Sequence, residues 1–180
     1  LLLNDGHGNL SDVTEAAGLG KKRWRRTYSA SFADLDRDSS PDLMVVSDFA
    51  GADLYKNDAY GRFTDVTAQW LDEPHAAGMA HAVADFDRDG LLDLLVIGMH
   101  SPTVDRLAHL GLTRPNFSND AAMRTELMHG NRFYLGRRDG GFRQGALSQS
   151  IARSGWSWGC SAFDFDNDGY EDVYIANGHE

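Results

Sequence analysis

The sequence has little cysteine and few positive charges, and it lacks any long hydrophobic run. Cys160 is the single cysteine among 180 residues, which excludes an internal disulfide and predicts a buried structural thiol. No stretch of 18 apolar residues occurs, so we expect no membrane insertion. Lys and Arg number 17 against 27 Asp and Glu, and the net charge of −10 argues against nucleic acid as a partner. These features describe an acidic globular chain with an ordinary hydrophobic content of 42%.

The acidic residues are concentrated in three nine-residue stretches, each with Asp at relative positions 1, 3, 5 and 9. Carboxylates directed at one point repel each other unless a cation lies between them, and hard oxygen ligands in a flexible loop suit Ca²⁺. Glycine at position 6 allows the turn in two stretches, whereas the first has Ser39 there and Pro41 before its last carboxylate. The spacing predicts up to three Ca²⁺ ions as cofactors. The predicted carboxylate ligands are Asp34, Asp36, Asp38 and Asp42; Asp85, Asp87, Asp89 and Asp93; and Asp164, Asp166, Asp168 and Asp172.

The three stretches connect strands rather than helices. An EF-hand loop carries a bidentate Glu at position 12 and has a helix on either side. Position 12 is Val45, Val96 or Ile175 in this sequence. The residues that flank each stretch are largely apolar and rich in β-formers, which is typical of buried strands. The sequence therefore predicts β-hairpins whose tips are the metal-binding loops.

A second motif alternates with the Asp-rich loops and shows that the chain repeats. Residues 3–14 match residues 56–67, each with a Gly/Asp turn between two short strands, and residues 135–143 form a weaker copy. The Asp-rich loops that begin at Asp34 and Asp85 are 51 residues apart (85 − 34). Two hairpins in each period of about 50 residues predict an all-β chain built from β-propeller blades of four antiparallel strands.

The repeat divides the chain into parts of a single propeller segment. A closed propeller takes about four to eight blades, so we expect a fragment of a larger propeller, with the rest of that propeller as its neighbour. Connections in a blade alternate between two faces, so an insert after a second strand lies on the face opposite the Asp-rich loops. The expected parts are a half blade at 1–14, a blade at 27–67, a blade at 79–146 with a helical insert at 101–130, and a half blade at 155–177.

The insert and the last half blade carry two further expectations. Apolar residues recur at helical spacing in 103–110 and 119–128, and the Ser-Asn pair at 118–119 supplies an N-cap for the second helix. Trp156 and Trp158 alternate with small residues, which predicts an inner strand packed in the core.

A cationic segment stands out in this acidic chain. Five Lys and Arg residues surround one Trp between positions 21 and 26. Guanidinium and indole groups suit an anionic ligand such as an acidic glycan, a sulfate group or an acidic protein surface. The alternative is a solvated loop whose cations pair with nearby acids. The predicted ligand-binding residues are Lys21, Lys22, Arg23, Trp24, Arg25 and Arg26.

Signals of catalysis are few. The sequence contains no H-E-x-x-H or P-loop motif, and its G-x-S-x-G match at residues 155–159 is better explained by the packing of a strand than by catalysis. A carboxylate held by Ca²⁺ stays ionised and is a poor general acid. We therefore expect a binding module with no catalytic residue. One alternative is the propeller part of a polysaccharide-acting enzyme, and another is a purely structural spacer. The candidate catalytic residues under the enzyme alternative are Glu73, Asp105, Glu126 and His129.

The loops and hairpins together resemble the FG-GAP/VCBS repeats, the calcium-binding blades of integrin α-subunit propellers. In residues 156–179, W-S-W-G leads into D-F-D-N-D-G and Y-I-A-N-G-H, which is similar to the subset found in cartilage acidic protein and UnbV/ASPIC-type proteins. The resemblance implies calcium at each loop, with the position-7 carbonyl groups of Ser40, Leu91 and Tyr170 as further ligands. It also implies an extracellular, cell-surface or periplasmic location and a non-catalytic role in adhesion, with an extracellular protein or glycan as the partner.

Overall fold

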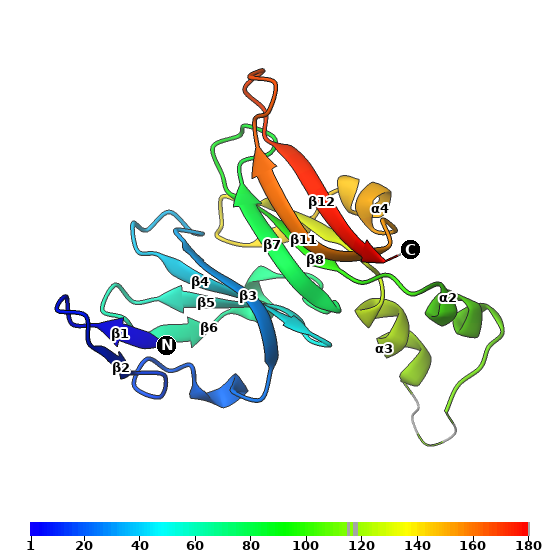
Figure 1. The fold of residues 1–180 in the computed structure, drawn as a ribbon, viewed down its shortest axis with the longest axis horizontal. Coiled ribbons are helices and arrows are strands. Elements are labelled where there is room, and N and C mark those ends of the chain that lie inside the picture. Colours follow the sequence, from blue (N-terminus) through cyan, green and yellow to red (C-terminus); the bar gives the residue numbers. More distant parts are fainter. Residues whose placement is uncertain (115, 117–118, 180) are drawn as a thin grey trace.

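The computed structural model describes residues 1–114, 116 and 119–179, and this part of the chain consists mainly of β-strands (Figure 1). Its twelve strands form four antiparallel sheets, which confirms the predicted all-β class. The first six strands are β1 Leu2–Asn4, β2 Leu10–Asp12, β3 Arg26–Ala33, β4 Asp42–Asp48, β5 Gly51–Asn57 and β6 Phe63–Asp65. The other six are β7 Gly78–Ala84, β8 Asp93–Gly98, β9 Arg132–Gly136, β10 Phe142–Gln144, β11 Trp156–Phe163 and β12 Asp172–His179.

Two of the sheets are four-stranded meanders. Their strand orders are β3-β4-β5-β6 and β7-β8-β9-β10, so each strand pairs with its neighbours in sequence. The pairs β1-β2 and β11-β12 form two-stranded sheets. A meander of four antiparallel strands is the form of a propeller blade.

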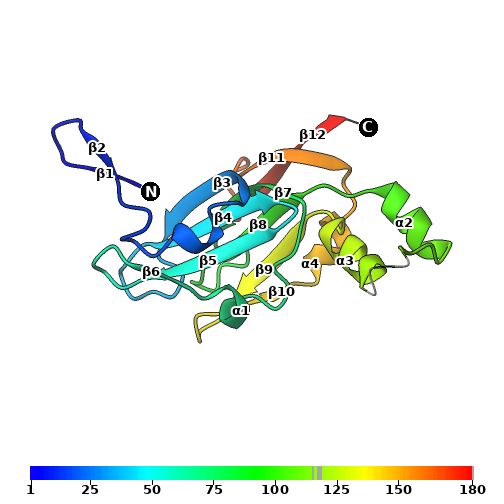
Figure 2. The same ribbon diagram turned by 90° about the horizontal axis from the view of Figure 1, so that it is seen from below.

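The first strands of successive sheets lie next to each other. β7 contacts both β3 and β11, and Figures 1 and 2 show β7 between these two strands. The sheets that begin with β3, β7 and β11 therefore stand side by side with these strands along one edge, as the inner strands of neighbouring blades do in a propeller.

The hydrophobic cores lie between the sheets. Successive side chains of a strand point to opposite faces, and β8 is buried along its whole length. Leu94 and Val96 belong to the core shared with the β3–β6 sheet, whereas Leu95 and Ile97 belong to the core shared with β11 and β12. Cys160 packs against this second core, where burial raises the pKa of its thiol to about 11. A half-buried thiol with a raised pKa agrees with the predicted structural role.

Short helices occupy the connections. They are the 3₁₀ helix η1 Gly20–Lys22 and the α-helices α1 Thr67–Trp70, α2 Pro102–His109, α3 Asp120–Leu127 and α4 Leu147–Ile151. α2 and α3 confirm the helical insert, and they lie at the end of the strands opposite the Asp-rich loops (Figure 1). Asn119 is the N-cap residue of α3, although its side chain makes no capping hydrogen bond, and Ser118 lies outside the described residues. α1 and α4 were not predicted, because four or five residues are too few to show a helical period.

The tryptophans of β11 do not pack in the core, contrary to expectation. Trp156 and Trp158 are 45% and 48% exposed, and the residue between them, Ser157, is fully buried. The alternation was predicted correctly, but the buried face carries a hydrogen-bonded polar group instead of the large rings. Ser157 Oγ donates to Asn177 Oδ1 at 2.9 Å, which compensates the serine hydroxyl for its loss of water.

Candidate metal centre

Each Asp-rich loop is folded by hydrogen bonds within itself. In the loop between β7 and β8, the Asp85 carboxylate accepts the N–H groups of Asp89 at 3.1 Å and Gly90 at 2.9 Å. The loops at 34–42 and 164–172 make the same two bonds with their first Asp. The turn places loop positions 4 and 6 at positive φ in all three loops, a conformation that the glycine at position 6 adopts without steric cost.

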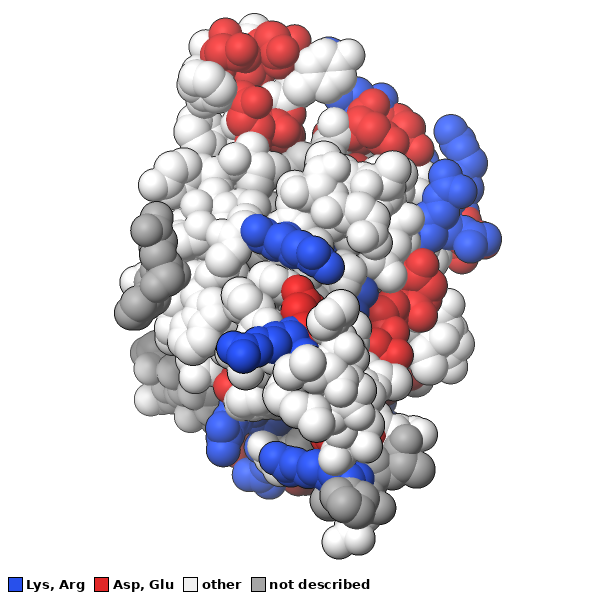
Figure 3. All heavy atoms as spheres, turned by 90° about the vertical axis from the view of Figure 1, so that its right-hand side faces the viewer, with Lys and Arg blue, Asp and Glu red and all other residues white. Residues whose placement is uncertain are grey.

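The turn brings carboxylate oxygens together in each loop. Positions 1, 3 and 9 each offer one oxygen, and within a loop these three atoms lie within 4.8 Å of one another. Figure 3 shows acidic side chains gathered at the upper end of the molecule, where the β7–β8 and β11–β12 loops lie in Figure 1. Like charges at this spacing disfavour one another unless a cation is present. The three groups are Asp34, Asp36 and Asp42; Asp85, Asp87 and Asp93; and Asp164, Asp166 and Asp172.

The Asp side chains predicted as ligands at position 5 bond to the backbone of position 7. Leu91 donates its N–H to the Asp89 carboxylate at 2.9 Å, so the carboxylate at loop position 5 is engaged with the backbone. The same bond joins Ser40 to Asp38 at 2.9 Å and Tyr170 to Asp168 at 2.8 Å. Among the described residues, the close oxygen groups consist of positions 1, 3 and 9 and do not include position 5.

The Asp at loop position 9 also has a structural role. Asp93 is 1% exposed, and its two oxygens accept the N–H groups of Phe86 at 3.0 Å and Gly136 at 2.8 Å. Burial raises the pKa of this carboxyl group, and the neighbouring carboxylates of the loop add to the rise. Asp42 is buried in the same way, with a raised pKa, and its donors are Leu35 and Asn57. The ninth Asp therefore ties the start of its loop to the third strand of its sheet.

The donor set suits Ca²⁺. Each group consists only of carboxylate oxygens, which are the hard ligands that Ca²⁺ takes, whereas Zn²⁺ and Cu²⁺ favour nitrogen and sulfur. In the second loop, three carboxylate oxygens lie within 4.8 Å of one another, and one of the carboxylates, that of Asp93, is only 1% exposed. A divalent cation would offset the repulsion between these carboxylates, so the residues of the second loop fit the ion.

The first loop differs, because it contains a cation of the protein itself. Lys56, which lies in β5, contacts the Asp36 carboxylate with its Nζ, and the same atom lies 3.0 Å from the Asp38 carboxylate. Hydrogen bonds to these two carboxylates raise the pKa of Lys56, and the bond from Lys56 lowers the pKa of Asp38. Sequence reasoning missed Lys56. The only signal was a lysine at a position where the other hairpin copies have Leu3 and Leu135.

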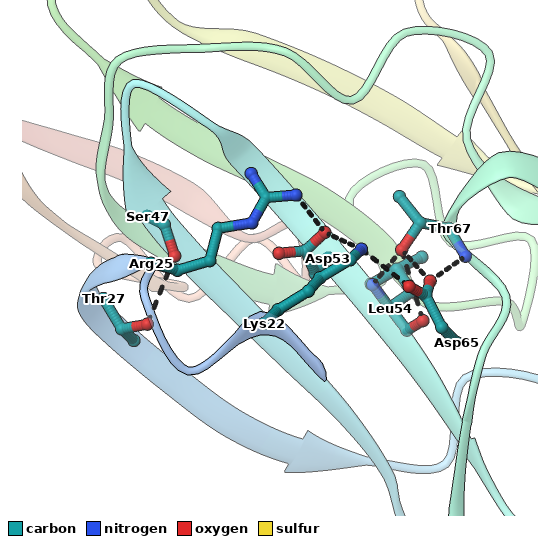
Figure 4. A network of polar contacts seen from close by, with 8 residues as sticks. All are labelled: Lys22, Arg25, Thr27, Ser47, Asp53, Leu54, Asp65 and Thr67. Atoms are coloured by element: carbon teal, nitrogen blue, oxygen red, sulfur yellow. Dashed lines mark hydrogen bonds and ion pairs between the residues drawn. The ribbon is translucent and has the colours of Figure 1, made fainter. Parts of the chain in front are cut away.

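Part of the cationic segment 21–26 serves the interior of the protein (Figure 4). Lys22 Nζ lies 2.6 Å from a carboxylate oxygen of Asp53 and 2.6 Å from one of Asp65. Arg25 lies 3.3 Å from Asp53, whose side chain is only 4% exposed. Lys22 and Arg25 are thus counter-ions of acids on β5 and β6, as the alternative interpretation of this segment held.

The rest of the segment faces solvent. Arg23 pairs with Glu15 at 3.0 Å, and both side chains are exposed, so the pair contributes little to stability. The Trp24 ring is 75% exposed and lies 5.1 Å from the guanidinium of Arg25. A ligand-binding site here stays a prediction for the exposed side chains, which are those of Lys21, Arg23, Trp24 and Arg26.

The four candidate catalytic residues fall into two groups. Glu73 and Glu126 lie with His75, and their potential ligand atoms are within 4.8 Å of one another. Asp105 and His129 instead line a cavity of about 320 Å³ on the side of the insert. Within the described residues, the candidates therefore do not form the single cluster that the enzyme alternative requires.

Comparison with known proteins gives the same repeat. The family model for the FG-GAP-like repeat matches residues 34–96 and 119–175. The chain belongs to the FG-GAP-like repeat family. The first match contains the first two Asp-rich loops of this FG-GAP-like chain, and the second match contains the third loop.

Two curated relatives resemble part of this FG-GAP-like chain. Cartilage acidic protein 1 of Mus musculus is 30% identical over 125 residues, which are 64% of this chain and 19% of the relative. Cartilage acidic protein 1 of Homo sapiens is 28% identical over the same length and shares. The chain thus spans about a fifth of the length of these relatives. Within the described residues, none of the helices has the length and apolar character needed to cross a membrane.

Proposed function

We propose that this FG-GAP-like chain is a calcium-binding, non-catalytic module of an extracellular protein, and that it binds an extracellular protein or glycan. One observation carries the calcium part of the proposal. The same three loop positions gather carboxylate oxygens within 4.8 Å in each of three equivalent loops. A single acidic turn is common at protein surfaces, but repetition of one geometry in successive sheets supports a loop that is built around a cation. The similarity to cartilage acidic protein 1 supports an extracellular location.

Calcium in these loops is structural. In the second loop the ion would be held by Asp85, Asp87 and Asp93, and Asp93 is in turn bonded to the third strand of its sheet. With about 1 mM extracellular Ca²⁺ and a weak-site Kd of about 10⁻⁴ M, each ion adds about 1.4 kcal/mol to the free energy of unfolding. A domain has about 5–15 kcal/mol of stability, so the effect of one or two ions is measurable.

Thermal unfolding with 1 mM CaCl₂, with MgCl₂ and with EGTA tests the calcium part. We expect a higher melting temperature in CaCl₂ alone. Asp85→Ala should lose part of this rise, because Asp85 offers an oxygen to the second group. Asp58→Ala is the matched control, since Asp58 lies in a hairpin turn outside the Asp-rich loops and its loss changes the net charge equally. An equal rise in MgCl₂, or an equal loss in both variants, contradicts calcium binding at this loop.

The face that carries the insert supports the binding part. The 320 Å³ cavity on this face is lined by His100, Asp105, His129 and Arg153, together with polar residues of α3 and α4. A few convergent polar groups in a concave surface are typical of ligand sites. The Asp105 carboxylate lies 3.4 Å from His100 Nε2 and 3.9 Å from Arg153, so a carboxylate or sulfate group of a ligand would compete with Asp105 for the exposed guanidinium. The chemistry of the cavity therefore fits an acidic glycan or an acidic protein loop.

Binding to an array of acidic and neutral glycans, with calcium present, tests the choice of face. We expect retention of acidic glycans and a loss of binding in Arg153→Ala. Arg138→Ala is the matched control, because Arg138 is exposed in the β9–β10 turn, outside the cavity. Release of shortened glycans would favour the enzyme alternative. Binding that is the same after residues 102–127 are replaced by a flexible linker would contradict the assigned face.

A further inference from the structure

Lys56 supplies a positive charge to the carboxylates of the first loop. Its Nζ contacts Asp36, one of the three close carboxylates, and lies 3.0 Å from Asp38. The Asp36 side chain is 12% exposed, whereas the Lys56 side chain is 38% exposed, so the carboxylate is shielded from water and the lysine is partly accessible. The ammonium also lies 6.0 Å from the centre of the Trp70 ring, whose face attracts a cation. The lysine is thus held on two sides, by carboxylates and by an aromatic ring.

The second loop has no such lysine. Asn57 donates its N–H to Asp42 at 2.9 Å, and Gly136 donates its N–H to Asp93 at 2.8 Å. Since Asp42 and Asp93 are the ninth residues of their loops, Asn57 and Gly136 occupy equivalent places in the third strands. The residues before them, Lys56 and Leu135, are therefore equivalent. Leu135 packs against the hydrophobic core instead of entering the loop.

The first loop differs from the others in its turn as well. Ser39 adopts a φ of 70° at loop position 6, where the second and third loops have Gly90 and Gly169. A residue with a Cβ is strained in this left-handed region. The first loop therefore departs from the other two in its turn, and from the second loop in the cation beside its carboxylates.

We propose that the Lys56 ammonium is the cation of the first loop, so that this chain binds two Ca²⁺ ions, at the second and third loops, and not three. The proposal rests on the calcium binding proposed above for those two loops. An ammonium is a compact point charge with three donors, and it satisfies two carboxylates of the first loop without any ligand from solution. Calcium would have to displace it and leave the lysine charge next to the ion.

Calcium titration by isothermal calorimetry, after the protein is stripped with EGTA, tests the proposal. We expect two bound ions per chain in the native protein and three in Lys56→Met, which keeps most of the aliphatic stem and removes the charge. Lys56→Arg, which keeps the charge, is the matched control and should still bind two. Asp36→Asn added to Lys56→Met should return the number to two, which places the gained ion in the first loop. Circular dichroism of each variant checks that the fold is kept.

The possible outcomes are distinct. Three ions in the native protein, or two ions in a folded Lys56→Met variant, would overturn the role of Lys56. If Lys56→Met is unfolded, Lys56→Gln takes its place with the same expected number. No calcium binding by the native protein or by any variant would instead refute the proposed function on which the inference rests.

Discussion

Replacement of Asp93 by Asn separates the metal-binding task of the ninth loop carboxylate from its structural task. Asp93 is buried, and both its oxygens accept backbone N–H groups. Asn has one acceptor oxygen, so one buried N–H group loses its partner, at a cost of about 1–3 kcal/mol. The substitution also removes a buried charge that Asp87 and Asp85 repel. These two effects oppose each other in the absence of calcium, so the stability in EGTA alone decides little.

The calcium-dependent part of the stability is the informative quantity. Under the proposal, two ions at about 1.4 kcal/mol each should contribute about 2.8 kcal/mol to the free energy of unfolding in 1 mM CaCl₂. Asp93→Asn should keep only the ion of the third loop, which lowers this difference to about 1.4 kcal/mol. Asp42→Asn is the matched variant, because Asp42 is buried and hydrogen-bonded in the same way. With Lys56 as the cation of its loop, Asp42→Asn should leave the difference at about 2.8 kcal/mol.

Urea unfolding followed by circular dichroism, in CaCl₂ and in EGTA, gives the difference for the native protein and both variants. The structural cost of each substitution is present in both buffers and cancels in the difference. An unchanged difference in Asp93→Asn would show that Asp93 is not a calcium ligand. An equal reduction in both variants would show that the first loop binds calcium, and would refute the argument from Lys56.

Three further predictions concern other parts of the fold. Burial lowers the pKa of His81, so the folded state favours neutral His81, and stability is lost as the pH falls from about 6.5 through the lowered pKa. In EGTA, the unfolding free energy should therefore fall less between pH 7.5 and pH 5 in His81→Asn than in the native protein. An identical fall would contradict this role of His81. Lys22→Met should lower the unfolding free energy by about 1.5–3 kcal/mol, because it removes a charged partner of the buried Asp53. The control Lys21→Met should change the unfolding free energy by less than about 0.5 kcal/mol. Equal effects of the two variants in thermal melts would show that the ion pair contributes nothing. Leu95→Ala should lower the unfolding free energy by about 2–5 kcal/mol, because Leu95 is 1% exposed in the core between two sheets. Urea unfolding should show this loss, with the difference between CaCl₂ and EGTA unchanged. A loss under about 1 kcal/mol would mean that the core closes around the smaller side chain.

The sequence was sufficient for features that depend on neighbouring residues. The apolar run from Leu94 to Ile97 indicated a buried strand, and both cores contain residues of that strand. The Asp-rich loops could be predicted for the same reason. Asp85 accepts the N–H groups of residues four and five positions later, so nine residues contain nearly all the information that folds the loop.

The same local pattern could not say which face of β11 is buried. Alternation in the sequence separates Trp156 and Trp158 from Ser157, but only the packing of neighbouring sheets assigns each side to core or solvent. Among the described residues, no further sheet covers the tryptophan side of β11. Hydrophobicity alone therefore placed these rings wrongly.

The sequence by itself determined the strands, the hairpins and the three groups of Asp, because hydrogen bonds between residues a few positions apart and the two-residue period of a strand produce them. Only the tertiary structure decided which charges meet. Lys56 reaches Asp36 across 20 positions of sequence, and Lys22 reaches Asp53 across 31. Such pairs form only when strands align in one register and sheets pack in one order. Three loops that look alike in sequence therefore differ in the charged side chains that lie beside them.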